Sequence, residues 1–200
     1  MKRILPITIL LCLAMGTSLR AQDTFGMFYS INFTTGNTND FISKTSFRGF
    51  TFDYRHHIRP ELSVGLSSGW YAFYERKDND TYSISEEQLS FSGIQYRYLN
   101  SAPLLVIVDY HLTPEELISP FAGLGIGTTY NRVNVTMGLY ETKESSWHFT
   151  LAPEIGVQVG RGSSLETWGF ISARYNYNFS TSDLDTQGYI TLNIGFMYGI

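Results

Sequence analysis

Large apolar residues recur at every second position along much of this chain, and the pattern is clearest in residues 187–200. In that stretch Ile190, Leu192, Ile194, Phe196, Tyr198 and Ile200 alternate with Thr191, Asn193, Gly195, Met197 and Gly199. Because successive side chains of a β-strand point to opposite faces, the pattern predicts a strand with one apolar face and one small or polar face.

The same alternation recurs along the rest of the chain and predicts an all-β protein. We expect eight strands, at residues 25–34, 50–58, 62–75, 94–112, 120–132, 147–159, 165–179 and 187–200. Residues 104–108 are apolar on both faces, and Pro103 before them has no N–H to donate to a ladder. A bulge or a register change is therefore expected near Pro103.

The connections between these strands alternate in length. Residues 36–46, 76–88 and 133–146 are long and polar, 180–187 is moderate, and the connections between them are short. An even strand number with short turns at one end and longer loops at the other is typical of an eight-stranded antiparallel up-and-down transmembrane β-barrel. The alternative is a soluble, lipocalin-like barrel, in which the apolar row would point inward.

Aromatic residues favour the membrane barrel, since they gather near the ends of the expected strands. They include Tyr29, Phe33, Tyr74, Tyr96, Tyr98, Tyr110, Tyr130, Trp147, Tyr175, Tyr177 and Tyr198. Transmembrane barrels carry such aromatic girdles at both membrane interfaces. The apolar residues Ile194, Phe196, Tyr198 and Ile200 of the last strand are predicted to act as the signal for the barrel-assembly machinery.

The beginning of the chain predicts export. Lys2 and Arg3 precede an apolar run, and a small residue follows at Ala21, so residues 1–21 are interpreted as a cleaved signal peptide and 22–200 as the barrel. Cys12 lacks a preceding small residue and is not expected to carry a lipid. Without the signal, no cysteine remains, which excludes disulfides and thiol chemistry.

Charge excludes one further class of function. Removal of the signal, which contains three of the 14 basic residues and no acid, leaves 11 basic against 18 acidic residues, a net charge of −7. Nucleic-acid binding relies on basic surfaces, so it is not expected. The expected surroundings are outer-membrane lipid, and the expected oligomeric state is a monomer.

Two short segments also resemble a known family. Residues 96–106 (YRYLNSAPLLV) and 120–127 (PFAGLGIG), together with the apolar last strand, are similar to the small, porin-like outer-membrane β-barrel proteins common in Bacteroidota. The resemblance extends over the chain that follows the signal peptide. It implies an outer-membrane location and no single activity.

Charged residues in the inward row are the first candidates for function. They are Asp53, Arg55, Arg97, Asp109, Glu154 and Arg174. An eight-stranded barrel is just wide enough for its side chains, and arginine–carboxylate pairs satisfy several donors at once. We therefore interpret the six as a structural charge network in a narrow lumen, with a polar passage as the alternative.

Histidine provides the second candidate. His148 follows Glu144, Ser145 and Ser146, so that a carboxylate, hydroxyls and an imidazole lie close in sequence. A barrel enzyme acting on outer-leaflet lipid would need such groups together, but no motif accompanies them. His56 and His57 are adjacent on a strand, so they face opposite sides and cannot share a metal.

The sequence thus predicts a barrel of structural or surface-interaction type, without catalysis, cofactor or metal. The loops at 36–46 and 76–88 are the expected sites for a surface ligand. The alternative functions are a lipid-modifying barrel enzyme and a narrow small-molecule transporter.

Overall fold

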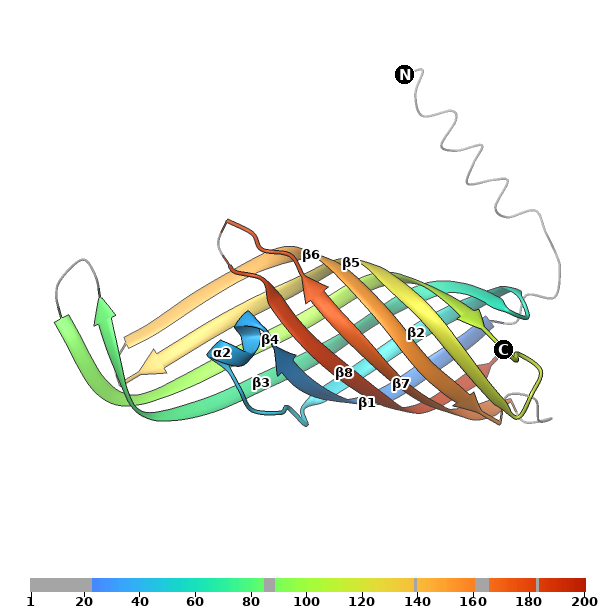
Figure 1. Ribbon diagram of the computed structural model, residues 1–200, viewed down its shortest axis with the longest axis horizontal. Coiled ribbons are helices and arrows are strands. Elements are labelled where there is room, and N and C mark those ends of the chain that lie inside the picture. The colour runs from blue at the N-terminus through green and yellow to red at the C-terminus, as the bar shows by residue number, and fades with distance from the viewer. Residues whose placement is uncertain (1–22, 85–88, 139, 161–165, 183) are drawn as a thin grey trace, which may run out of the picture.

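The structure, a computed structural model, describes residues 23–84, 89–138, 140–160, 166–182 and 184–200, and in these residues eight antiparallel strands close into a barrel (Figure 1). The elements are β1 (Asp23–Thr35), α2 (Asn37–Phe41), β2 (Gly49–Arg59), β3 (Leu62–Ile84), β4 (Leu89–His111), β5 (Ile118–Met137), β6 (Tyr140–Val159), β7 (Thr167–Asn178) and β8 (Gln187–Gly199). Each strand pairs with its neighbour in the chain, and β8 closes the ring on β1 from Thr24↔Gly199 to Thr35↔Gly188. The predicted eight-stranded architecture is confirmed, and the predicted signal peptide lies outside the described residues.

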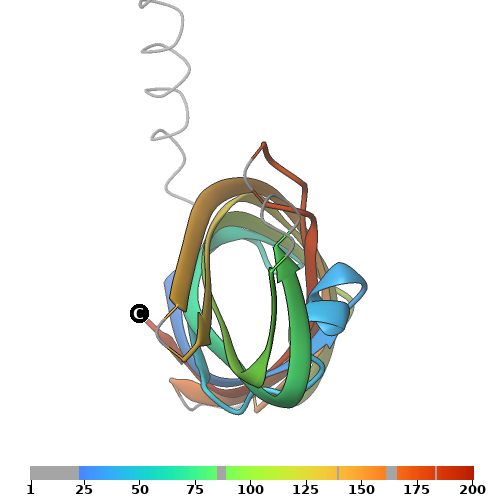
Figure 2. The same ribbon diagram turned by 90° about the vertical axis from the view of Figure 1, so that its left-hand side faces the viewer.

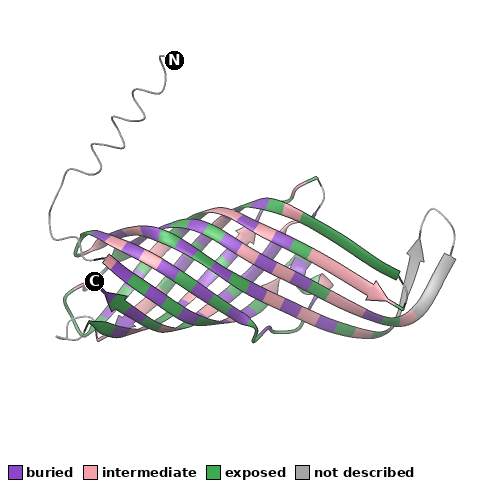
Figure 3. Ribbon diagram, turned by 180° about the vertical axis from the view of Figure 1, so that it is seen from behind, coloured by how far each residue is buried: buried purple, intermediate pink, exposed green. Residues whose placement is uncertain are grey.

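The two faces of the wall differ as the alternation predicts (Figure 3). On β8, Met197 is fully buried, whereas its neighbour Phe196 is 69% exposed. On β7, Arg174 is buried and Ile171 is exposed. The barrel therefore turns charged and polar groups inward and apolar groups outward, which is the reverse of the lipocalin-like alternative.

The two ends of the barrel also differ. In Figure 1 the short turns and the C-terminal residue lie at the right, and the β3–β4 and β5–β6 hairpins extend at the left. We call these the turn end and the hairpin end. Figure 2 views the barrel from the hairpin end, where α2 lies beside the opening. No helix in the described part of the chain is long and apolar enough to span a membrane.

Beyond the barrel rim, four strands continue as an extension that we call the outer sheet. It consists of residues 72–84 of β3, 89–100 of β4, 132–137 of β5 and 140–149 of β6. Among the described residues, β3 pairs with β2 only up to Tyr71, and β6 pairs with β7 only from Thr150. The Ala72 N–H still donates to the Arg48 carbonyl, and the Phe149 carbonyl accepts from the Phe179 N–H. Farther from the barrel, the described part of the outer sheet has two open edges.

The outer sheet corrects most of the prediction that residues 76–88 and 133–146 are loops, and residues 85–88 and 139 lie outside the described residues. β3 continues to Ile84 and β4 begins at Leu89, while β5 runs to Met137 and β6 begins at Tyr140. Paired backbones need no apolar alternation, and outside the barrel the two faces of a sheet need not differ in polarity. The strands therefore continue where the sequence pattern fades. The loop predicted at 36–46 does leave β1, and it contains α2.

The prediction of a bulge or register change near Pro103 is wrong. β4 keeps one register against β5 from Gln95↔Met137 to His111↔Phe121, with Pro103 opposite Thr129. The irregularity between β3 and β4 lies instead between Lys77 and Asp80. Residues 104–108 are apolar on both faces because Leu105 and Ile107 pack with Ala152 inside the lumen.

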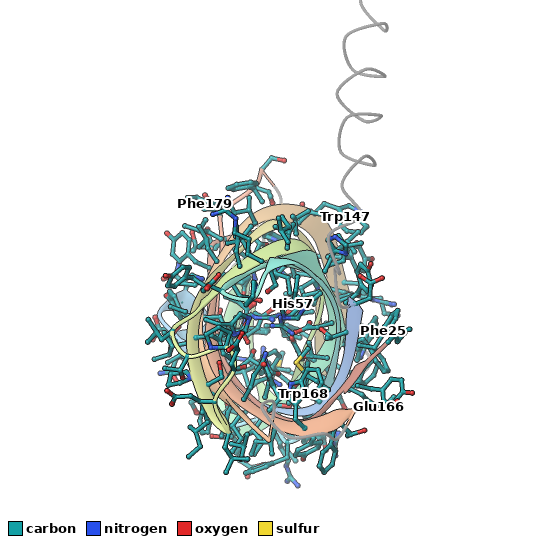
Figure 4. All side chains as sticks on the ribbon, turned by 90° about the vertical axis from the view of Figure 1, so that its right-hand side faces the viewer. Phe25, His57, Trp147, Glu166, Trp168 and Phe179 are labelled. Carbon is teal, nitrogen blue, oxygen red and sulfur yellow. The ribbon has the colours of Figure 1, made fainter. Side chains whose placement is uncertain are left out.

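Apolar clusters fill both ends of the lumen. A turn-side cluster comprises Phe28, Phe121, Trp168, Phe170 and Met197. A loop-side cluster comprises Ile42, Tyr71, Phe73, Leu99 and Tyr189. In Figure 4, which looks in from the turn end, His57 and Trp168 lie inside the ring, whereas Phe25, Trp147 and Phe179 lie outside it. Apolar side chains from the wall therefore occupy the lumen toward both of its ends.

Candidate functional site

Five charged residues meet inside the barrel, and we call them the lumen charge network. Asp53 and Arg55 come from β2, Asp109 from β4, Glu154 from β6 and Arg174 from β7, and each is at most 3% exposed. All five side chains come from strand positions that face the lumen, so the strands bring them together. The three acids and two arginines leave a formal charge of −1.

Arg55 connects three of the carboxylates. Its Nη1 lies 2.8 Å from Asp53 Oδ2, its Nε lies 2.6 Å from Asp109 Oδ2, and its Nη2 lies 3.8 Å from Glu154 Oε2. The guanidinium carbon also lies 5.0 Å from the Phe170 ring centroid. Arg55 is thus held between the carboxylates and the turn-side cluster, with its charge compensated in a space closed to water.

Arg174 connects the other side of the network. Its Nη2 lies 2.8 Å from Glu154 Oε2 and 3.4 Å from Asp53 Oδ2, and its Nη1 donates to Ser67 Oγ at 2.6 Å. Ser172 Oγ in turn donates to the second oxygen of Glu154. Neither serine was predicted as a site residue, although both lie in the inward row of strands that carry or adjoin the predicted charges.

Arg97, the sixth charged residue of the predicted row, lies apart from the other five. Its Nε donates to Gln95 Oε1 at 2.6 Å, its Nη1 donates to the Phe41 carbonyl at 3.0 Å, and its guanidinium lies over the Phe41 ring. Arg97 therefore anchors α2 to the outer sheet. The six predicted residues all belong to the inner face of the wall, but Arg97 lies at a different height along the barrel axis from the other five. The alternation within a strand does not reveal that height.

His148 ties two strands together. Its side chain is fully buried, and Nδ1 lies 2.7 Å from the Phe179 carbonyl, just beyond β7. Within the described structure, no hydrogen bond joins His148 to Glu144, Ser145 or Ser146. The arrangement that a hydrolytic triad requires is therefore not assembled at this histidine.

The other histidines also take part in the wall. His56 points outward, with Nδ1 2.7 Å from Asp23 Oδ1, while His57 points inward with its ring centroid 5.6 Å from that of His111. In the described residues, no group of three or more His, Cys, Asp or Glu side chains could hold a metal ion.

A pocket opens at the hairpin end, and we call it the mouth pocket. Its volume is about 580 Å³. It lies against the inner face of the outer sheet, between α2 and the β7–β8 connection. Its lining includes Phe41, Val133, Val135, Met137, Glu144 and Asp185. The sequence analysis expected a surface site in the loops, but the strand extensions that form this wall were not predicted.

The geometry defines an eight-stranded antiparallel barrel with a filled, charged lumen and an apolar outer surface. No family model matches the chain, and no curated protein matches it. Membership in the family that the sequence resembles therefore stays a prediction.

Solved structures show the class of fold. Outer membrane protein OprG from Pseudomonas aeruginosa superposes with a TM-score of 0.53 at 10% identity, over 90% of this chain and 96% of that one. Neisserial surface protein A gives 0.52 at 14% identity, over 89% and 96%. Ail, the attachment invasion locus protein of Yersinia pestis, solved with the heparin analogue sucrose octasulfate, gives 0.51 at 15% identity, over 90% and 100%. The fold of this chain is that of the eight-stranded outer-membrane barrels.

Proposed function

We propose that this protein is an integral outer-membrane barrel with a sealed lumen, and that it acts by binding a ligand or partner at its hairpin end. The proposal rests on the difference between the buried lumen charge network and the open mouth pocket. The lumen charges contact one another between two apolar clusters. The mouth pocket, in contrast, is open and accessible.

The outer surface supports a lipid environment. Exposed residues on the wall include Met27, Leu66, Ile126, Ile155, Ile194 and Phe196. A soluble protein rarely exposes an apolar surface that extends around the whole molecule. A closed barrel can meet lipid with such a surface, because its strands leave no unpaired edge in the hydrocarbon.

Orientation follows from the two ends of the barrel. In outer-membrane barrels the short turns face the periplasm and the longer connections face outward. We infer that the chain is exported by its signal peptide, inserted by the barrel-assembly machinery through the face of β8 that carries Ile194 and Phe196, and held as a monomer. The outer sheet and the mouth pocket then lie outside the cell.

The experiment that tests the proposal combines solubility and conductance. The purified protein should require detergent, migrate differently on gels with and without boiling, and insert into planar lipid bilayers without a steady current. A monodisperse monomer in the absence of detergent would contradict the membrane location. A steady single-channel current would instead refute the sealed lumen and support a narrow transporter.

A further inference from the structure

The mouth pocket has an apolar wall. Val133, Val135 and Met137 are alternate residues of β5, so they share the inner face of the outer sheet, and all three line the pocket. Phe41 of α2 and Leu184 of the β7–β8 connection also line it. A ligand with an apolar body would find a surface there that excludes water.

Among the described residues of the pocket lining, the two that carry charge are both acids. Glu144 comes from β6 and Asp185 from the β7–β8 connection. In the part of the chain that the structure describes, neither carboxylate takes part in an ion pair. The neighbouring Glu141 differs, because its carboxylate lies 2.7 Å from Lys143 Nζ.

Arg97 lies beside the pocket, since it donates to Gln95 and to the carbonyl of Phe41, two residues of the lining. Its single positive charge is opposed by the two carboxylates of Glu144 and Asp185. The described charges at the pocket therefore sum to −1 beside an apolar wall. Anionic ligands such as lipid phosphates are disfavoured, while a cation gains from both carboxylates.

Hydrogen bonds hold the walls of the pocket in place. Thr38 Oγ1 donates to Gln187 Oε1 at 3.0 Å and accepts from the Gly188 N–H at 2.8 Å, and Gln187 Nε2 donates to the Asp185 carbonyl at 3.1 Å. These bonds tie α2 to the start of β8. A preformed pocket spares a ligand the entropic cost of ordering its walls.

From these observations we propose that the mouth pocket binds a small organic cation, an amine or guanidine attached to an apolar or aromatic body. Its volume of about 580 Å³ suits a small molecule. The apolar body would lie against Val133, Val135 and Met137, and the cation would face Glu144 and Asp185. This inference rests on the proposed function, because it assigns a ligand class to the same outward surface.

The test uses three probes that share a phenylethyl body and differ in charge: phenethylamine, 2-phenylethanol and 3-phenylpropanoate. The full barrel, folded in phosphatidylcholine nanodiscs, is titrated with each probe while its backbone amide NMR signals are followed. Phenethylamine should shift the amides of Val133, Val135 and Asp185 to saturation. 3-Phenylpropanoate should bind at least about tenfold more weakly, since it meets two carboxylates instead of gaining from them.

Three variants locate the charge recognition. Glu144→Gln and Asp185→Asn should each weaken phenethylamine binding roughly threefold, the size expected for a solvent-accessible charge pair. Glu141→Gln is the matched control, since it removes a carboxylate from the other face of the same strand, and it should leave binding unchanged. Val135→Asn should weaken phenethylamine and 2-phenylethanol alike, because it interrupts the apolar wall.

The outcomes separate this inference from the proposed function. Equal binding of the amine and the carboxylate, or shifts confined to lipid-facing amides, would overturn the ligand class while the folded, inserted barrel stands. Failure of the wild-type chain to fold in nanodiscs would overturn the proposed function itself.

Discussion

Arg174 shows how one residue connects the wall of this barrel across its lumen. It contacts Glu154 of β6, Asp53 of β2 and Ser67 of β3, none of which is its neighbour in sequence. Inside a packed lumen, each of these groups has lost its water. The geometry therefore makes Arg174 a cross-link among three strands other than its own.

Replacing Arg174 should lower the free energy of unfolding of the barrel. Arg174→Ala removes the closer of the two arginines that contact Glu154 and leaves Arg55 alone to face the three carboxylates of the network. Loss of one partner of a buried pair costs roughly 3–5 kcal/mol. The double variant Arg174→Ala/Glu154→Ala should be less destabilised than the sum of the two single variants, by about 1–3 kcal/mol. Reversible urea unfolding in lipid vesicles gives the four free energies.

Arg97 provides the control for the double-mutant cycle of Arg174 and Glu154. It lies outside the lumen charge network and binds Phe41 of α2, so Arg97→Ala and Arg174→Ala should have additive effects. Coupling of Arg174 to Arg97 as strong as its coupling to Glu154 would mean that the network is not a local unit.

Gly123 explains why the network fits. A Cβ at this position would lie 1.9 Å from Asp109 Oδ1, so the absence of a side chain on β5 makes room for the carboxylate that Arg55 binds. The inward position of Gly123 is readable from the alternation. Its role as space for Asp109 is not, because that contact depends on the register between β4 and β5.

At the scale of the element, β8 and the residue that follows it place exposed isoleucines on the outer face at different distances from the turn end. Ile194 lies midway along the strand, opposite Tyr29 of β1 and Ile171 of β7, and is exposed on the outside. Ile200 follows the end of β8 at the turn end and is also exposed. The two isoleucines share a face but differ in their expected depth in the membrane.

Arginine at these two positions should therefore have different effects. Ile194→Arg should lower the free energy of unfolding in lipid by about 2–4 kcal/mol, the cost of arginine near the midplane of a transmembrane barrel. Ile200→Arg should cost at most about 1 kcal/mol, because an interfacial position keeps the charge hydrated. Equal losses in the same vesicle assay would mean that the outer face does not cross a hydrocarbon layer.

Strand content was predictable where alternation was strong. β8 was expected at residues 187–200 and runs from Gln187 to Gly199. The extension of β5 to Met137 was not, because its apolar positions change face: Leu124 and Ile126 point outward, whereas Val133 and Val135 point toward the mouth pocket. The bulge near Pro103 was expected because proline has no N–H for the ladder. β4 nevertheless keeps one register against β5 on both sides of Pro103, so no inserted residue is needed.

The candidate site was predictable only in part. All five members of the lumen charge network were singled out by their inward positions, but their separation from Arg97 depends on the stagger of the strands. The mouth pocket joins Glu144 of β6 with Asp185, which lies far away in the sequence. Such a pocket exists only once the chain has folded.

At the scale of the whole molecule, the barrel and the outer sheet are separable parts. Replacing residues 134–143 by Asn-Gly would join the facing pair Val133↔Glu144 through a two-residue hairpin turn. The barrel below should keep its free energy of unfolding to within about 1 kcal/mol, because surface changes away from packed features cost little.

The mouth pocket should be lost in the same variant, since Val135, Met137, Tyr140 and Thr142 disappear from its lining. Retention of phenethylamine binding would place the ligand elsewhere, and loss of barrel folding would show that the outer sheet is part of the folding unit. Unfolding and NMR titration in lipid measure the two properties separately.

Closure of the ring through β1 and β8 has a consequence for the timing of biogenesis. The pair Thr24↔Gly199 joins residues from opposite ends of the barrel sequence, so β1 stays without one of its two neighbours until β8 has been synthesised and has joined the ring. Contacts between such distant residues form late, because a long loop must close before they contribute any stability. During that interval the open edge of β1 is a template for pairing with any other strand. We therefore expect an unfinished chain to aggregate unless the edge of β1 is shielded until β8 pairs with it.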